Sequence, residues 1–186
     1  MLAMNGSPPT EMRIVRKFPR TAWNQVWKNL HASPVLDEIN STWYRALHYL
    51  IPTNDKLATI NLTDTSACSS CCHPDSLQHK ITGCGEGPVI WIWTKKLLGY
   101  ILGVDHRHIP QDWAIRPDFQ QWPPQKRSAV LWIMAHFVQY RFLTQRRLSL
   151  LDYMDFLRRA RWKLYQQARR PRVTGRYLDV IDWPQY

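Results

Sequence analysis

Apolar side chains recur every three or four residues along most of this chain, which is the period of an α-helix. The first stripe predicts a helix that begins after the N-cap residue Thr21. The second predicts a helix over residues 36–51 that Pro52 stops, after which Asn54 is expected to cap a short helix that runs to Ile60. The apolar residues of the first two stripes are Trp23, Val26, Trp27 and Leu30, and then Ile39, Trp43, Ala46, Leu47 and Leu50.

Three longer apolar segments follow in the second half of the chain. Residues 88–103 begin with β-branched residues typical of a strand, but the length of the run favours a helix. Residues 125–145 are apolar nearly all round, which predicts a central helix buried on most of its surface. Ser149 and Asp152 resemble a capping box for a last long helix that Pro171 ends. Its inward side is expected to hold Leu150, Tyr153, Met154, Leu157, Ala160 and Leu164.

Composition narrows the class of protein. The 186 residues are 45% hydrophobic and include ten tryptophans, which excludes a chain disordered as a whole. Charged residues make up 21%, and the uncharged stretch in the most apolar segment, 128–140, is shorter than the roughly 18 residues of a transmembrane helix. The N-terminus lacks the apolar region of a signal peptide. We therefore expect a soluble protein of the nucleus or cytoplasm, with no membrane partner.

Positive charge is concentrated in the C-terminal part of the chain. The net charge is +2 over residues 1–115 and +9 over residues 116–186. Eight Lys and Arg residues and no acidic residue lie between Phe156 and Leu178. This density points to a polyanionic partner, such as nucleic acid or an anionic membrane surface, rather than to a merely solvated helix face, and nucleic acid, RNA or DNA, is the partner we expect. The residues expected to contact phosphates are Arg158, Arg159, Arg161, Lys163, Arg169 and Arg170, of which Arg159, Lys163 and Arg170 share one side of the predicted helix.

The four cysteines of the chain lie within seventeen residues of one another. In a reducing compartment such clustering favours a metal site over disulfides. The spacing is Cys68-x2-Cys71-x7-His79-x4-Cys84, which supplies the three thiolates and one imidazole of a tetrahedral zinc site. Small residues between the first two cysteines permit the tight turn that this spacing needs. Zn²⁺ is therefore the expected cofactor.

Cys72 and His73 are spare donors in the same loop. An alternative ligand set is Cys68-x3-Cys72-x6-His79-x4-Cys84, in which Cys72 replaces Cys71. Four free thiols in a polar loop are a further alternative. We favour Cys71.

The cysteine spacing, together with the strings Thr42-Trp43-Tyr44-Arg45 and Leu50-Ile51-Pro52-Thr53-Asn54, resembles a known family. It is similar to the zinc-binding domain that follows the polymerase domain in reverse transcriptases of non-LTR (LINE-like) retrotransposons. The family pattern, C-x(2 or 3)-C-x(7 or 8)-H-x4-C, supports Cys71 over Cys72. The motif covers residues 43–84, with a vaguer likeness as far as Arg158 to Trp162. The resemblance implies a module that handles RNA and DNA in target-primed reverse transcription.

No catalytic residues are expected. A polymerase needs clustered carboxylates for two metal ions, and no two adjacent Asp residues occur in the sequence. Asp152 and Asp155 are interpreted as a capping acid and a solvated acid. Gly-rich phosphate loops and hydrolase motifs are absent from the sequence. His48 and His136 fall on apolar faces and are interpreted as core histidines, and His106 and His108 as surface residues.

The predicted architecture is a mostly α fold: a small helical domain with an inserted CCHC zinc-binding loop and a basic C-terminal helix. The predicted function is that of a zinc-binding nucleic-acid-binding module without a polymerase site. The alternative is a decayed or repurposed zinc-stabilised helical protein-interaction domain. Along the chain we expect a mobile Pro-rich leader (1–20), a helical region (21–103) with the zinc-binding loop (68–84), a Pro-rich crossover (104–124) held by Trp113, Phe119 and Trp122, and a basic helical region and tail (125–186).

Overall fold

The structure is a computed structural model that describes residues 20–119, 122–143 and 149–167. These residues are mostly helical, as the sequence predicts, and they contain no β-strand. Their β-type pairing is limited to one isolated antiparallel bridge between Ala67 and Pro74. The helices are α2 (Trp23–His31), α3 (Asp37–Leu47), α4 (Asn54–Thr59), α5 (Gly87–Leu102), α6 (Pro124–Leu143) and α7 (Leu150–Gln167).

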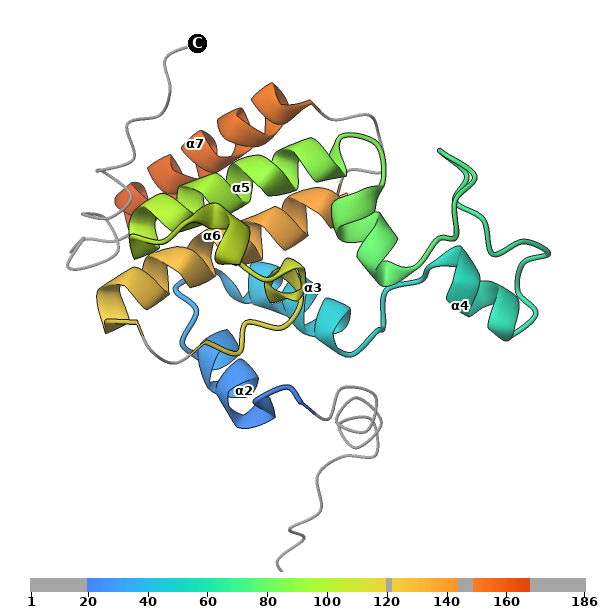
Figure 1. Ribbon diagram of the computed structural model, residues 1–186, viewed down its shortest axis with the longest axis horizontal. Helices are drawn as coiled ribbons and strands as arrows, with labels where there is room; N and C mark the ends of the chain where they lie inside the picture. Colours follow the sequence, from blue (N-terminus) through green and yellow to red (C-terminus); the bar gives the residue numbers. More distant parts are fainter. Residues whose placement is uncertain (1–19, 120–121, 144–148, 168–186) are drawn as a thin grey trace, which may run out of the picture.

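Helix α6 is the centre of the fold. Every residue from 129 to 140 is buried, which confirms the predicted core helix. It packs against α3, α5 and α7, and Figure 1 shows α5, α6 and α7 lying side by side. His136 is buried in this helix, and its Nδ1–H donates to the carbonyl oxygen of Trp132 at 2.8 Å, as expected of a core histidine. His48 of the segment after α3 is also buried.

Residues 87–102 form a helix, α5, and not a strand. Pro88 stands in its first turn, where a missing N–H costs no hydrogen bond, and Gly103 ends it in the left-handed conformation. One side of α5 is buried, with Ile90, Trp91 and Leu98 almost fully covered. The opposite side carries exposed apolar side chains.

Helix α7 begins with the predicted capping box. The Ser149 N–H donates to Asp152 Oδ2 at 3.0 Å, and the Asp152 N–H donates to Ser149 Oγ at 3.2 Å. Two backbone donors that would otherwise lack partners at the helix start are thereby satisfied. Of the predicted inward residues, Tyr153, Met154 and Leu157 are buried and Leu150 and Ala160 are half-buried, whereas the side chain of Leu164 and the predicted stop Pro171 lie outside the described residues.

Two predicted helix boundaries are wrong. The N-cap of α2 is Ala22, without a side-chain hydrogen bond, so Thr21 does not cap it. Helix α3 ends at Leu47, four residues before the predicted end. Tyr49 adopts a left-handed φ of 53°, and the Leu50 N–H turns back to the carbonyl of Arg45 at 2.8 Å. Leu50 therefore leaves the predicted apolar stripe and is 48% exposed.

The predicted cap of the short helix is also wrong. The N-cap of α4 is Thr53, and Asn54 is the first helical residue. The Asn54 side chain instead donates from Nδ2 to the carbonyl of Ala67, at 2.6 Å. The Asn54 side chain, which the local sequence predicts to be a helix cap, forms a hydrogen bond to a residue thirteen positions away instead.

The segment between α5 and α6 is irregular, as predicted, and contains the short 3-10 helices η2 (His106–His108) and η3 (Gln111–Ala114). Phe119 is buried with its ring centroid 4.9 Å from that of Trp113. Asn29 of α2 donates to the carbonyl of Phe119 at 3.0 Å, which fastens the crossover to the first helix. The described helices include no segment that could cross a lipid bilayer.

Candidate metal centre

Cys68 and Cys71 lie on a tight hairpin between α4 and η1 (His79–Gly83). The Cys68 N–H donates to the carbonyl of His73 at 2.7 Å, and the Cys72 N–H donates to the carbonyl of Cys68 at 2.8 Å. Two intervening residues therefore suffice to bring both thiols to the inner side of the turn. The isolated bridge between Ala67 and Pro74 closes the base of this hairpin.

His79 and Cys84 come from a helical turn that follows the hairpin. The Cys84 N–H donates to the carbonyl of His79, five residues earlier, at 2.7 Å, which is the bond of a π-helix. This wide turn explains how four intervening residues place both side chains on the same side. Gly83 permits the close packing of the turn, because a Cβ there would lie 3.2 Å from His79 Nδ1.

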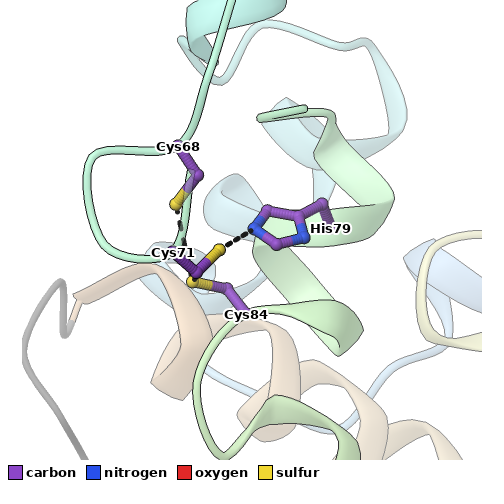
Figure 2. Close-up of side chains that lie close together, drawn as sticks. All are labelled: Cys68, Cys71, His79 and Cys84. Carbon is purple, nitrogen blue, oxygen red and sulfur yellow. Dashed lines mark hydrogen bonds between the residues drawn. The ribbon is translucent and has the colours of Figure 1, made fainter. Parts of the chain in front are cut away.

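The four predicted ligands meet at one point (Figure 2). Their donor atoms all lie within 4.8 Å of one another. The Sγ atoms of Cys68 and Cys84 are 3.6 Å apart, and those of Cys71 and Cys84 are 3.9 Å apart. Zn–S bonds of about 2.3 Å in a tetrahedron put two sulfurs about 3.8 Å apart. His79 completes the set with Nε2 at 3.2 Å from Cys71 Sγ. The group could therefore hold a metal ion such as zinc.

The ionisation of the thiols also favours a cation. Burial raises the pKa of Cys68, but hydrogen bonds from the Ser70 N–H, His79 and the other two thiols lower it to about 6. Burial and the neighbouring thiols Cys68 and Cys71 together raise the pKa of Cys84 to about 12. Without a cation the three thiols therefore do not all ionise at neutral pH, because thiolates this close would repel one another, and a divalent cation at their centre offsets that repulsion.

Cys72 is not part of this group. Its side chain is exposed, and its backbone is left-handed, with φ at 60°. An L-residue pays about 1–2 kcal/mol for that conformation, so Cys72 occupies a position that suits glycine. The structure therefore brings Cys71, rather than Cys72, to the other three ligands.

Arg141 of α6 fixes the turn that carries His79 and Cys84. Its Nε donates to the carbonyl of Ile81 at 2.8 Å, and its Nη2 donates to those of Lys80 and Cys84 at 3.1 and 2.8 Å. The Arg141 guanidinium thus donates hydrogen bonds to three carbonyl oxygens at the end of a helical turn. This contact was not predicted, although Arg141 is the first charged residue after a long uncharged run.

Leu77 and Ile81 attach the same turn to the core. Both are buried among the residues of the main hydrophobic cluster. The hairpin is different: between residues 61 and 76 only Cys68 and Asp75 are buried. The turn with His79 and Cys84 is therefore packed on the helical core, whereas the hairpin with Cys68 and Cys71 projects from it.

Polar contacts join the hairpin to α4. The Asn54 N–H donates to Asp75 Oδ2 at 2.8 Å. From the turn η1, the Lys80 ammonium donates to the carbonyl of Pro52, just before α4, at 3.0 Å. With the bond from Asn54 Nδ2 to Ala67, these contacts connect the hairpin and the following turn to the start of the short helix. Figure 1 shows both elements at one end of the molecule, beyond the α5–α7 layer.

Four of the six predicted nucleic-acid residues lie on α7, away from the hairpin. Arg158, Arg159 and Lys163 are exposed, Arg161 is half-buried, and Arg169 and Arg170 lie outside the described residues. Arg158 forms a salt bridge of 2.9 Å with Asp155, the acid interpreted as solvated, while Asp152 caps the helix as predicted. The four described cations, Arg158, Arg159, Arg161 and Lys163, are called the basic segment of α7 below.

Comparison with known proteins found no family model, no curated protein and no solved structure that matches this chain. The resemblance to the retrotransposon family therefore stays a prediction that rests on the motif residues quoted above.

Proposed function

We propose that this chain is a zinc-stabilised helical module that binds nucleic acid and resembles the C-terminal part of a retrotransposon reverse transcriptase, without the polymerase site. The observation that carries the proposal is the exposed basic segment of α7 on a body that also holds a Cys3His group. Arg159 and Lys163, one helical turn apart, have no salt bridge within the described part of the chain.

The zinc ion has a structural role in this proposal. Three cysteines and one histidine fill the four positions of a tetrahedral ion, which leaves none for a water molecule or a substrate. The ion would hold the hairpin against the turn of His79 and Cys84. It would do so without contacting nucleic acid itself.

Nucleic acid fits the basic segment because phosphates are closely spaced anions. Each phosphate neutralised by Lys or Arg releases counterions, so affinity falls steeply with salt. Contacts of this kind position a protein on nucleic acid and carry little sequence information. We expect binding to RNA and DNA of many sequences, and a salt titration on the zinc-loaded protein tests it.

A zinc-stabilised protein-interaction domain is the second candidate. The observation in its favour is the outer side of α5, where Val89, Ile92 and Tyr100 are 52%, 47% and 65% exposed. Large exposed apolar side chains are common in protein interfaces. This candidate is supported if the zinc-loaded protein binds neither RNA nor DNA at low salt while substitution of these three residues abolishes association with a protein partner.

A further inference from the structure

Trp162 on α7 has an exposed aromatic side chain, which phosphate binding by Lys and Arg does not explain. Its side chain is 64% exposed, although it lies on a helix whose opposite side is buried in the core. No ring of another described residue stacks on it. Tryptophan is enriched at binding surfaces, because its flat apolar ring and its N–H both gain contacts when a partner covers them.

The neighbours of Trp162 on the helix are cations. Arg158 and Arg159 stand four and three residues before it, and Lys163 follows it. Residues three and four apart are neighbours on a helix surface, and helical side chains lean toward the N-terminus, so the indole leans over the turn that holds the two arginines. Aromatic surface and positive charge therefore occupy one exposed patch.

We propose that this patch binds single-stranded nucleic acid, with an unpaired base stacked on Trp162 and the adjoining phosphates on Arg159 and Lys163. The inference rests on the proposed function and narrows its ligand. Interleaved aromatic and basic side chains are the recognised means of holding a single strand, because every base offers a flat face and the chain between bases offers phosphates.

A duplex would not use the indole. Its bases are stacked on one another and show only their edges in the grooves. Arg159 and Lys163 would still contact duplex phosphates, so the duplex is expected to bind, but without the contribution of Trp162. An acidic peptide would engage the cations and also leave the indole without a flat partner.

The test measures affinities of the full-length zinc-loaded protein for three probes at fixed salt: a 20-nucleotide RNA or DNA strand, the duplex of the same sequence, and a strand of equal length with abasic sites throughout. Trp162→Ala is expected to lower affinity for the intact strand about tenfold and to leave the duplex and the abasic strand unchanged. Trp162→Phe should recover part of the loss. Tyr100→Ala is the matched control, since Tyr100 is 65% exposed but lies on α5, and it should change none of the three affinities.

The outcomes separate this inference from the proposed function. Equal losses for all three probes, or no loss at all in Trp162→Ala, would overturn the stacking role while nucleic-acid binding stands. Failure of the unaltered protein to bind any probe at 50 mM salt would overturn both. Zinc content and the thermal unfolding midpoint of each variant show whether a loss comes from the patch or from the fold.

Discussion

The Nη2 atom of Arg141 lies 2.8 Å from the carbonyl oxygen of Cys84, and this hydrogen bond joins the central helix to the last ligand of the metal centre. The same guanidinium binds two further carbonyls of the turn. Gly87 makes room for it, because a Cβ there would lie 2.8 Å from an Nη2 atom. The position of Cys84 is therefore set by the helical core as well as by the local turn.

Arg141→Ala is expected to weaken both the fold and the metal site. Three carbonyls lose a charged donor, and each such hydrogen bond contributes about 1.5–3 kcal/mol. Removing the partly buried guanidinium also recovers its desolvation cost, so we expect a net loss of about 3 kcal/mol in the free energy of unfolding. Affinity for zinc should fall at least about tenfold, as it does when other supports of metal ligands are removed. Chelator competition measures it.

Arg127→Ala is the control for this variant, because it removes the same charge from the first turns of α6, far along the helix from Cys84. It should leave zinc affinity unchanged. An Arg141→Ala protein that holds zinc as tightly as the Arg127→Ala protein would show that the contact has no part in the metal site.

Substitution at the adjacent cysteines distinguishes Cys71 from Cys72. Cys71→Ser is expected to abolish binding of the single zinc ion, and Cys72→Ser to leave it intact. Cys72→Gly should keep the ion and stabilise the protein by up to about 1 kcal/mol, because glycine adopts the left-handed conformation without strain. Elemental analysis and urea unfolding measure the two effects. Zinc lost from Cys72→Ser but kept by Cys71→Ser would reverse the assignment.

Removal of the metal is expected to act locally. Amide hydrogen exchange after chelation should increase most over residues 66–75, which have little buried surface of their own, and less over the turn of Leu77 and Ile81. Residues 129–140 should stay protected, and added zinc should restore the hairpin. Equal loss of protection in the hairpin and in α6 would mean that the ion holds the whole core.

Binding to nucleic acid is expected to depend strongly on salt. Six phosphate contacts give a slope of about −5 for log affinity against log salt on duplex DNA, and about −4 on a single strand. The double variant Arg159→Ala, Lys163→Ala should bind all sequences more weakly, with a duplex slope smaller in magnitude by about 2. Arg45→Ala with Lys96→Ala, two exposed cations on α3 and α5, removes the same charge elsewhere and should change the slope little. Identical slopes in the two double variants would exclude the basic segment as the binding surface.

His136 is expected to make the fold sensitive to acid. Burial lowers its pKa to about 4, although the hydrogen bond to the Trp132 carbonyl opposes the shift. The unfolded chain, with an ordinary pKa near 6.5, binds the proton first, so His136 costs no stability above that pH and destabilises the fold progressively between about pH 6.5 and 4, by up to about 3 kcal/mol. His136→Leu should therefore gain stability over the unaltered protein as the pH falls through this window, and a constant difference between their melting temperatures would contradict the prediction.

The long elements and the ligand set could be predicted from the sequence. Helix α6 is apolar all round because it is covered on every side, and the capping box of α7 is a local exchange between Ser149 and Asp152. Local spacing points to Cys68, His79 and Cys84 but leaves Cys71 and Cys72 as alternatives, and the preference for Cys71 comes from the family resemblance. In each case the sequence signal lies in residues that are close together in the chain.

The features that the sequence analysis predicted wrongly or missed depend on the tertiary fold or on an unusual backbone conformation. Asn54 forms its side-chain bond to Ala67 rather than capping its own helix, and a left-handed Tyr49 ends α3 before Leu50 can join its apolar side. Arg141 lies about sixty residues from the carbonyls that it binds, so no local pattern points to it. The exposure of Trp162 likewise depends on which side of α7 meets the core.

Two of the four ligands lie on the projecting hairpin and two on a turn packed against the core, so a bound ion connects the two parts. An ion bound to Cys68 and Cys84 acts as a reversible cross-link across a seventeen-residue segment, and closing a loop of that size removes about 3 kcal/mol of chain entropy from the unfolded state in the case of a disulfide. Unlike a disulfide, this cross-link forms by mass action. Free zinc at a hundred times its dissociation constant stabilises the bound form by about 2.7 kcal/mol, and a tenfold fall in free zinc from that level removes about half of this stabilisation. The fraction of molecules with an ordered hairpin therefore depends on the concentration of free zinc, whereas the folding of the helical core does not.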